Sequence, residues 1–246
     1  MFFSRPSVAW RKTMVKGFAL VVLGFLQACA AVPYPDKRDP LESMNRGIFS
    51  FNDKVDRAVL KPVATGYRDV TPQWAQTGVH NFFNNLEDVW SVVNNVLQFR
   101  GREAGDNTGR VLINSTIGFI GLVDVASGLK IERHPANFGL TLGRWGVGAG
   151  PYIVLPLLGP SSLRELVALP IDYRGNVLNS VQDVGTRDGL SVLTLVDTRA
   201  SYLKAGEVVD GVALDPYSFF RDAYLQRRRN QVYDGDPPDE EEAPAP

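Results

Sequence analysis

The chain has 246 residues, of which 44% are hydrophobic and 22% are charged, and its formal net charge at pH 7 is −1. This length suits one or two domains, and the composition is that of an ordinary folded protein. A nucleic-acid-binding protein normally carries a basic face, so the near-neutral charge argues against nucleic acid as a partner.

The first 28 residues have the pattern of a bacterial secretory signal peptide. Basic residues precede the apolar run Gly17–Leu26, which is too short to cross a membrane stably. The motif LQAC at residues 26–29 resembles a lipobox, in which the cysteine is acylated and becomes the new N-terminus. Cys29 is the only cysteine, so no internal disulfide can form. A free or buried thiol is the alternative, but the position at a signal junction favours lipidation, and Ala30 favours the outer over the inner membrane.

An amphipathic helix is predicted to follow a short lipidated tether that covers residues 29–38. Asp39 and Glu42 have the spacing of an N-cap and its capping-box partner. Apolar residues then recur at helical intervals as far as Val59. Pro62 is expected to end the helix, because proline has no N–H to donate.

Side-chain amides lie beside the apolar faces of this helix and of the next. Asn45 and Asn52 adjoin the apolar stripe of the first helix, where packing between helices is the favoured role and contact with lipid headgroups the alternative. Residues 74–99 are predicted to form one long helix or two shorter ones. Amides beside its aromatic-rich face suit a bilayer interface or an amphipathic pore, with a polar network in a core as the alternative. These amides are Asn81, Asn84, Asn85, Asn94 and Asn95.

Two further helices are predicted over residues 102–115 and 137–144, on either side of an apolar segment. That segment, Thr116–Gly128, is punctuated by glycine and interrupted by Asp124. Its pattern indicates a re-entrant or hairpin element rather than a pair of strands.

The uncharged run Trp145–Leu163 is long enough for a membrane span but rich in glycine and proline. Its three prolines would each cost about 3 kcal/mol in a helix interior, and its four glycines about 1 kcal/mol apiece. Its seven aliphatic residues return only about 0.3–0.6 kcal/mol each on insertion. A straight helix is therefore excluded. The run is either buried in protein or lines a cavity of a membrane-embedded protein, with a loop–strand–loop in a soluble core as the alternative.

The C-terminal part is predicted to be helical and to end in a disordered tail. Ser162 and Glu165 have capping-box spacing for a helix that Pro170 is expected to end. Two amphipathic segments follow, and Asp215 suits the N-cap of a last helix. These elements are expected at residues 176–184, 190–203 and 215–232. Residues 234–246 are acidic and rich in proline, as is typical of disordered tails.

The sequence contains no evident catalytic machinery. Its two histidines, His80 and His134, are far apart, and the folded part has no cysteine to complete a zinc site. Neither a nucleophile elbow nor a P-loop motif is present. The glycines at positions 146, 148 and 150 resemble a phosphate loop only faintly, because Pro151 follows at once and no helix is predicted to begin there.

Four stretches of the chain resemble the MlaA (VacJ) family of lipoproteins. They are Asp39–Tyr67, Gly78–Gln98, Phe138–Arg164 and Asp215–Arg227. The resemblance runs through residues 39–233, which are expected to form one domain, and leaves the acidic tail outside.

The resemblance implies a mainly α fold, in which a single domain of amphipathic helices forms a ring in the outer membrane, with irregular Gly/Pro-rich apolar segments. It also implies a channel protein that is lipid-anchored, faces the periplasm and uses no cofactor, metal or catalytic residue. Such a protein associates with a trimeric porin, removes misplaced phospholipid from the outer leaflet and passes it to a periplasmic lipid carrier. An envelope lipid hydrolase and a structural envelope lipoprotein that only anchors are the alternatives.

Candidate residues of the lipid path follow from the resemblance and from the boundary positions described above. They are Asn45, Phe51 and Asn52 on the first helix, Asn81, Phe82 and Phe83 on the second, and Pro151, Tyr152 and Pro156 in the apolar run. We expect Trp145–Leu163 to lie in the channel wall or its rim and not to cross the bilayer as a helix.

Overall fold

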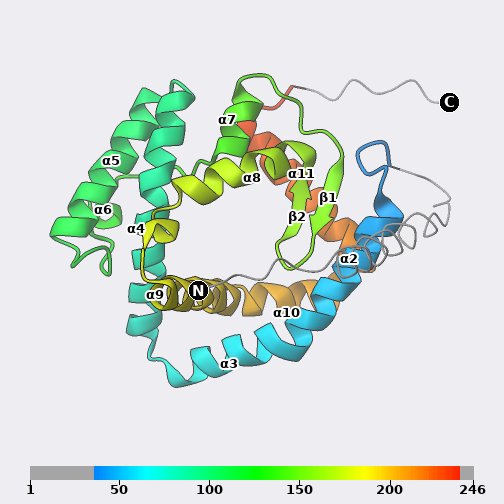
Figure 1. The fold of residues 1–246 in the computed structure, drawn as a ribbon, viewed down its shortest axis with the longest axis horizontal. Coiled ribbons are helices and arrows are strands. Elements are labelled where there is room, and N and C mark those ends of the chain that lie inside the picture. Colours follow the sequence, from blue (N-terminus) through cyan, green and yellow to red (C-terminus); the bar gives the residue numbers. More distant parts are fainter. Residues whose placement is uncertain (1–35, 239–246) are drawn as a thin grey trace, which may run out of the picture.

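The computed structural model describes residues 36–238, which form a mainly helical domain with one small β-hairpin (Figure 1). The elements are α2 (Glu42–Val55), η1 (Asp56–Leu60), α3 (Lys61–Val70), α4 (Gln73–Leu97), α5 (Gly101–Thr116), α6 (Val125–Gly128), α7 (Phe138–Arg144), β1 (Tyr152–Leu155), β2 (Gly159–Ser162), α8 (Leu163–Gly175), η2 (Val177–Ser180), α9 (Val184–Ser201), α10 (Leu203–Val212) and α11 (Pro216–Val232). No described helix is both long enough and apolar enough to cross a membrane. The mainly α fold expected from the sequence is confirmed, while the predicted signal peptide and Cys29 lie outside the described residues.

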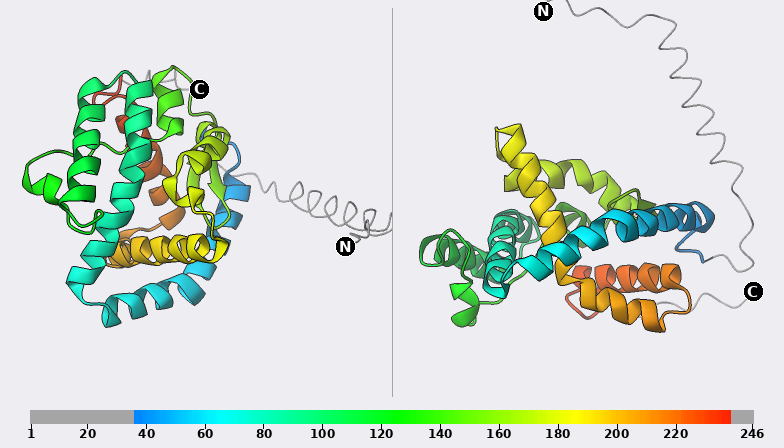
Figure 2. Two further views of the ribbon diagram at one scale, coloured as in Figure 1. Left: turned by 60° about the vertical axis from the view of Figure 1, so that its left-hand side comes forward. Right: turned by 90° about the horizontal axis from the view of Figure 1, so that it is seen from below.

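The ribbons of the domain are arranged as a ring (Figure 1). α4 forms one side, α9 and α10 run below the opening with α3 lower still, α2 lies on the opposite side, and α8, α11 and the hairpin complete the top. α5 packs along the outer side of α4 (Figure 2, left). The rest of the ring is held by contacts between α3 and α9 and between α7 and α8.

α2, η1 and α3 follow one another without a break, so Pro62 does not end the helix, although the helical path bends between α2 and α3 (Figure 1). The π-helical turn η1 joins them, and the N–H of Lys61 bonds to the carbonyl of Asp56 five residues before it. This wider turn relieves the clash that the ring of Pro62 would make in a regular helix. The predicted helix end at Pro62 is therefore wrong. Pro170 likewise lies inside α8, which continues to Gly175.

Helix capping agrees with the sequence at two helix starts and differs at a third. The side chains of Ser162 and Asp215 each accept a hydrogen bond from a first-turn N–H, of α8 and α11 respectively. Asp39, in contrast, does not cap α2. Its buried carboxylate accepts from the Asn45 amide and the Tyr217 hydroxyl instead. Side chains brought close by the tertiary structure have thus replaced the first-turn N–H of α2 as its hydrogen-bond partners.

The apolar run Trp145–Leu163 contains a short antiparallel hairpin instead of being irregular throughout. β1 and β2 pair with Tyr152 opposite Ser162, and residues 156–158 form the turn. The aromatic and aliphatic residues of β1 favour a strand, whereas the glycines of the preceding loop do not. Side chains alternate along β1, so that Tyr152 and Val154 are fully buried. The exclusion of a straight helix is confirmed, and the strand pairing was not predicted.

The hairpin also holds a hydrophobic core of the ring. Tyr152, Val154 and Tyr217 are buried together, with Ile48 and Phe49 of α2 packed against them. The ring centroids of Tyr152 and Tyr217 lie 6.3 Å apart, and those of Phe49 and Tyr217 lie 5.7 Å apart. α2 and α11 therefore pack on the hairpin together.

The segment Thr116–Gly128 is a turn followed by the short helix α6. Phe119, Ile120 and Gly121 have positive φ angles of 53°, 60° and 90°, which reverse the chain after α5. Asp124 caps α6 by accepting a hydrogen bond from a first-turn N–H. The predicted reversal is present, but it is made by a turn and a helix. Phe119 and Ile120 remain 74% and 71% exposed.

The region that precedes α11 contains more helix than predicted, because α9 begins at Val184 and α10 was not foreseen. The predicted disordered tail begins at Asp234, which forms ion pairs with Arg100 and Arg144. The start of the tail is thus held against the domain, contrary to the prediction for that residue. Residues 239–246 lie outside the described range.

Candidate functional site

Two asparagines of α2 hold the hairpin by its backbone. The Asn45 amide donates to the Tyr152 carbonyl oxygen at 3.0 Å and accepts from the Val154 N–H at 2.9 Å. The Asn52 amide donates to the Leu155 carbonyl oxygen at 2.9 Å and accepts from the N–H two residues further on at 2.8 Å. Each side chain thus pairs with the hairpin as the peptide group of a neighbouring strand would.

The spacing of the two amides explains how a helix can take the place of a strand. Seven residues along α2 rise about 10.5 Å. The groups that the amides contact are three residues apart along an extended chain, which is about 10 Å. Asn45 is fully buried, and Asn52 is half-buried. Both amides thus pack α2 on the hairpin, whereas the sequence favoured packing between helices.

A buried polar cluster fixes the base of the hairpin. The Tyr217 hydroxyl donates to the Asp39 carboxylate, and an Arg221 guanidinium nitrogen lies 3.6 Å from the same carboxylate. Burial raises the pKa of Tyr217, and the Asp39 contact raises it further. Burial is also the main cause that raises the pKa of Tyr152. Both tyrosines therefore stay neutral at physiological pH.

A cavity of about 450 Å³ lies between the hairpin, α4, α7, α8 and α11, and we call it the hairpin cavity. Its size is within the range of ligand pockets, about 300–1,000 Å³. Part of its lining is apolar and comes from four elements: Trp90 of α4, Leu140 of α7, Leu155 and Leu158 of the hairpin, and Leu169 of α8. Leu158 is 67% exposed, so this wall offers apolar surface to a ligand.

Close packing between α4 and α8 positions Trp90 in this wall. The indole N–H donates to an Asp172 carboxylate oxygen at 2.7 Å, and the same oxygen accepts from the Phe138 N–H at 2.7 Å. A Cβ atom on Gly175 would lie 2.3 Å from the indole ring. Only glycine therefore permits this approach of the end of α8 to α4.

Another part of the lining is charged. An Arg228 guanidinium nitrogen lies 2.5 Å from a Glu165 carboxylate oxygen, which also accepts from the Asn137 amide at 3.2 Å. Arg227 lines the same cavity, is exposed, and makes no hydrogen bond or ion pair with any residue in 36–238. The lining also includes the carboxylates of Glu87 and Asp172, so the cavity combines apolar surface with charges of both signs. Arg227 is the cation without a partner among the described residues, and a guanidinium suits phosphate groups.

Three of the predicted lipid-path residues lie together, and three others lie apart from one another. Asn45, Asn52 and Tyr152 meet where α2 contacts the hairpin. Phe51 is 49% exposed on α2, Pro151 precedes β1, and Pro156 is exposed at the hairpin turn. None of the nine predicted residues, all of which are described, lines the hairpin cavity. Asn45, Asn52 and Tyr152 nevertheless support the hairpin, which itself lines the cavity.

The other three predicted residues lie on α4, beside α5 and the turn after it. The ring centroids of Phe82 and Phe83 are 5.3 Å apart, and Phe83 is buried. The Asn81 amide donates to the Leu122 carbonyl oxygen at 3.2 Å. The structure therefore brings these three residues together with one another and not with the hairpin.

The residues of the cavity walls were not selected from the sequence. In the sequence, Trp90 is one of several apolar residues at helical spacing in residues 74–99. Arg227 and Arg228 are cations near the predicted C-terminus of a helix, where they suit the helix dipole. A usable signal was present on α8, where Glu165 and Asp172 are seven residues apart and so lie on one helical face. Two carboxylates on an otherwise apolar face indicate polar partners.

Other amides of α4 form an internal polar network. Asn94 and Asn95 are fully buried. The side-chain oxygen Oδ1 of Asn94 accepts from the Thr141 hydroxyl at 2.8 Å, and the Asn95 side-chain amide donates to the backbone carbonyl oxygen of His134 at 3.0 Å. Asn85 donates to a serine of α5 at 2.9 Å. For these three asparagines the core-network alternative is correct, and the bilayer-interface interpretation is wrong.

The two histidines take part in contacts between elements. His80 Nδ1 lies 3.1 Å from an Asp197 carboxylate oxygen, and His134 Nε2 lies 3.2 Å from an oxygen of Asp106. Within residues 36–238, no group of three or more histidine or carboxylate side chains is placed to hold a metal ion.

Comparisons with known proteins find related chains over most of the sequence. A family model described as "MlaA lipoprotein" matches residues 37–231. An uncharacterised protein of Rickettsia bellii is 35% identical over 197 residues, which cover 79% of this chain and 76% of the relative. The Escherichia coli (strain K12) protein named "Intermembrane phospholipid transport system lipoprotein MlaA" is 37% identical over 203 residues, which cover 78% and 77%.

A solved structure described as "Structural basis for maintenance of bacterial outer membrane lipid asymmetry" superimposes with a TM-score of 0.70 at 36% sequence identity. The match covers 79% of this chain and 98% of that chain. Sequence and fold therefore agree over nearly the whole described domain, and the chain belongs to the MlaA lipoprotein family.

Proposed function

We propose that this protein is the lipid-anchored outer-membrane component of a phospholipid-trafficking system. It removes mislocalised phospholipid from the outer leaflet through an amphipathic channel and passes it to a periplasmic carrier, which maintains the lipid asymmetry of the membrane. Cys29 carries the anchor, the domain faces the periplasm, and a trimeric porin is its partner in the membrane. No covalent bond of the lipid is broken, and no cofactor takes part.

The observation that carries the proposal is the hairpin cavity with its apolar and charged walls. A glycerophospholipid has apolar chains and an anionic phosphate, so it needs both kinds of surface on one path. Contact with Leu155, Leu158 and Trp90 favours the chains by about 25 cal/mol per Å² of surface removed from water. Arg227 offers a charged donor to the phosphate.

The support of the hairpin fits the same role. Non-helical backbone at membrane depth persists only where protein groups or cavity water satisfy its amides. Asn45 and Asn52 supply such partners to the hairpin, so its apolar side chains can face a lipid path without exposing unpaired backbone groups. The name of the Escherichia coli relative points to the same substrate class.

A matched pair of hairpin variants tests this function. Leu158 lines the cavity and the adjacent Leu157 does not, although both are 67% exposed. We expect Leu158→Gln to slow transfer of labelled phospholipid from vesicles to a periplasmic carrier about fivefold, because it removes apolar contact worth about 1 kcal/mol. Leu157→Gln should transfer lipid at the rate of the unmodified protein.

Mass spectrometry of the lipids in the same vesicles distinguishes transport from hydrolysis. Intact phospholipid in the acceptor supports the proposal. Free fatty acid or lysophospholipid that accumulates with time would identify a hydrolase instead. A protein that binds vesicles but neither transfers nor cleaves lipid would be a structural lipoprotein. Equal transfer rates for the two leucine variants would remove the hairpin cavity from the path.

A further inference from the structure

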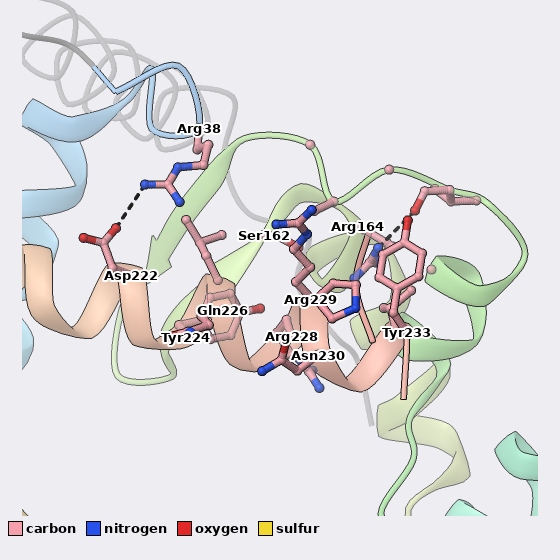
Figure 3. Close-up of a pocket in the computed structure, with 18 of the residues that line it drawn as sticks. Arg38, Ser162, Arg164, Asp222, Tyr224, Gln226, Arg228, Arg229, Asn230 and Tyr233 are labelled. Carbon is pink, nitrogen blue, oxygen red and sulfur yellow. Dashed lines mark hydrogen bonds and ion pairs between the residues drawn. The ribbon is translucent and has the colours of Figure 1, made fainter. Parts of the chain in front are cut away.

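A second cavity, of about 580 Å³, lies between the loop Gly146–Gly150 and the last turns of α11 (Figure 3). We call it the arginine cavity. Arg38, Arg164, Arg228 and Arg229 line it, and Asp222 is its one carboxylate. The described lining carries a net charge of +3, and Asp36 and Glu165, which pair with Arg38 and Arg228 from outside the lining, reduce it to +1. The remaining positive charge favours an anionic ligand.

The arginine cavity contains a buried cation whose protein contacts are incomplete. Arg164 is 8% exposed. One of its terminal nitrogens donates to the Val147 carbonyl oxygen at 3.0 Å, and its nearest carboxylate, Glu165, is 3.8 Å away. Its Nε atom is buried without a hydrogen-bond partner among the described residues. Burial lowers the pKa of Arg164, so an anion bound beside it would stabilise its charge.

The loop above Arg164 leaves room for a ligand to approach its backbone. Gly146 and Gly150 have φ angles of +89° and +67°, which favour glycine. Gly148 lines the cavity, and a Cβ atom placed on it would meet no atom within 4 Å. The ligand therefore faces arginine side chains from α8 and α11 on one side and open glycine backbone on the other.

The arginine cavity and the hairpin cavity are neighbours. Tyr224 and Arg228 line both of them, so a single layer of α11 side chains stands between the two spaces. The centre of the Arg228 guanidinium lies 5.9 Å from the centre of the Tyr224 ring. A lipid in the hairpin cavity is thus one side chain away from the arginine cavity.

We propose that the arginine cavity binds the phosphodiester of the phospholipid as it leaves the hairpin cavity. This inference rests on the proposed function and names the chemistry that it selects. A net positive site binds anionic phosphatidylglycerol more tightly than phosphatidylethanolamine, whose ammonium group cancels the charge of its phosphate. Arg164, Arg228 and Arg229 contact the phosphate oxygens.

Binding of short-chain lipids to the full-length protein in neutral detergent tests this site. Titration calorimetry compares dihexanoyl phosphatidylglycerol, dihexanoyl phosphatidylethanolamine and inorganic phosphate. We expect phosphatidylglycerol to bind most tightly, because a free phosphate lacks the chains that contact the cavity wall. Equal binding of all three ligands, or tighter binding of inorganic phosphate, would identify an anion site unrelated to lipid and would overturn the proposal.

The decisive variants place a side chain on Gly148, where no native contact is lost. Gly148→Glu and Gly148→Gln differ only in charge. We expect Gly148→Glu to weaken phosphatidylglycerol binding about tenfold relative to Gly148→Gln, and Arg229→Gln to weaken it by a similar factor relative to the unmodified chain. Equal affinity of the two Gly148 variants would refute the assignment.

The acidic residues 239–242 follow this cavity in the chain and are a further source of negative charge, beside Asp36 and Glu165. A triple variant of the full-length protein, with Glu240→Gln, Glu241→Gln and Glu242→Gln, measures the effect of this charge on phosphatidylglycerol binding. If phosphatidylglycerol binds to this variant but not to the unmodified protein, the tail itself occupies the anion site and the proposal fails. Lipid transfer by the leucine variants is measured independently, so transport that persists without binding here would leave the proposed function standing.

Discussion

The buried amide of Asn45 takes the place of a strand that β1 lacks on one side. It contacts the backbone of Tyr152 and Val154 and also donates to Asp39 at 2.8 Å. Removing one partner from a buried hydrogen bond costs more than the bond contributes, because the other partner stays desolvated. Asn52 makes the same kind of contact near the exposed turn, where water can replace it.

This difference predicts unequal effects of the two alanine variants. Asn45→Ala should lower the free energy of unfolding by about 3 kcal/mol, because it leaves several buried groups unpaired. Asn52→Ala should cost about 1 kcal/mol and leave the protein folded, but loosen the hairpin and alter lipid transfer. Urea unfolding followed by circular dichroism measures both, with Asn230→Ala as an exposed control. If Asn52→Ala leaves outer-membrane asymmetry and detergent sensitivity untouched at normal protein levels, Asn52 has no role in supporting the lipid path.

Asp124 gives the fold a measurable pH dependence. Burial acts to raise its pKa, but hydrogen bonds from Ser127, Arg110 and Asn114 outweigh burial and lower the pKa from 3.8 to about 2. The pKa is thus lower in the folded than in the unfolded state. The ionised carboxylate stabilises the fold above about pH 4, and this contribution is lost as the pH falls to about 2.

The expected result is a free energy of unfolding that falls between about pH 4 and pH 2, with a shallower fall in Asp124→Asn. Part of the slope remains in the variant, because a hydrogen bond from Arg38 also lowers the pKa of Asp36 to about 2. Urea titrations at a series of pH values check this, with the exposed Asp188→Asn as the control. An unchanged slope in Asp124→Asn would contradict the role given to its hydrogen bonds.

At the scale of elements, the hairpin is a short sheet held by helices. An isolated two-stranded hairpin is marginal in water, so its order depends on α2 and on the core around Tyr217. Pro151 precedes β1 and Pro156 begins the turn, and each fixes one φ angle near −65°. The two prolines thus stiffen both ends of the strand that contributes Leu155 to the hairpin cavity.

Replacing Pro151 and Pro156 together by alanine should loosen the hairpin while the protein still folds. The cost is about 1–2 kcal/mol, because the unfolded chain gains freedom at two positions. Lipid transfer should change more than the thermal midpoint does. Transfer that matches the unmodified protein would show that the stiffness of the hairpin has no role.

Cysteine scanning from Val147 to Leu158, in a variant anchored without Cys29, tests the geometry of the same segment. A water-soluble thiol reagent should label the variants Ile153→Cys and Leu155→Cys but not Val154→Cys, because Val154 is fully buried. Uniform protection along the run would mean that it is wholly buried or faces lipid, and the channel-wall assignment would be dropped.

At the scale of the whole molecule, contacts between distant segments close the ring. Arg46 of α2 binds Asp215 at 2.7 and 3.1 Å, and its guanidinium carbon lies 4.3 Å from the Tyr217 ring centre. Arg199 of α9 binds Asp56 at 2.7 and 2.9 Å. Such two-pronged arginine–carboxylate pairs add geometric specificity, because the planar donors fit two oxygens at once.

The attachment of this ring to the membrane is predicted to depend on Cys29. Cys29→Ser should leave an unprocessed or mislocalised precursor, because stable anchoring needs two or more acyl chains and this is the only cysteine. Membrane fractionation and mass spectrometry of the mature N-terminus check this. The matched control is Ser43→Ala in the folded domain, which should be processed and localised like the unmodified protein. Recovery of a mature chain with an unmodified Cys29 would refute the anchor.

The sequence alone determined those features whose signals lie within one or two turns of chain. The caps at Ser162 and Asp215 were predictable because a capping side chain contacts its own helix. The exclusion of a straight helix over Trp145–Leu163 followed from the summed cost of its prolines and glycines. The long motifs also identified the family correctly.

The tertiary structure decided the features that depend on partners far along the chain. Asp39 leaves its local capping role for Tyr217, and Pro62 and Pro170 are tolerated inside helices that the rest of the fold holds in place. The hairpin pairs because Asn45, more than a hundred residues away, completes its hydrogen bonds. The hairpin cavity likewise joins side chains from α4, α7, α8, α11 and the hairpin. Local propensity carries no information on which distant groups converge, because that depends on the packing of all the elements together.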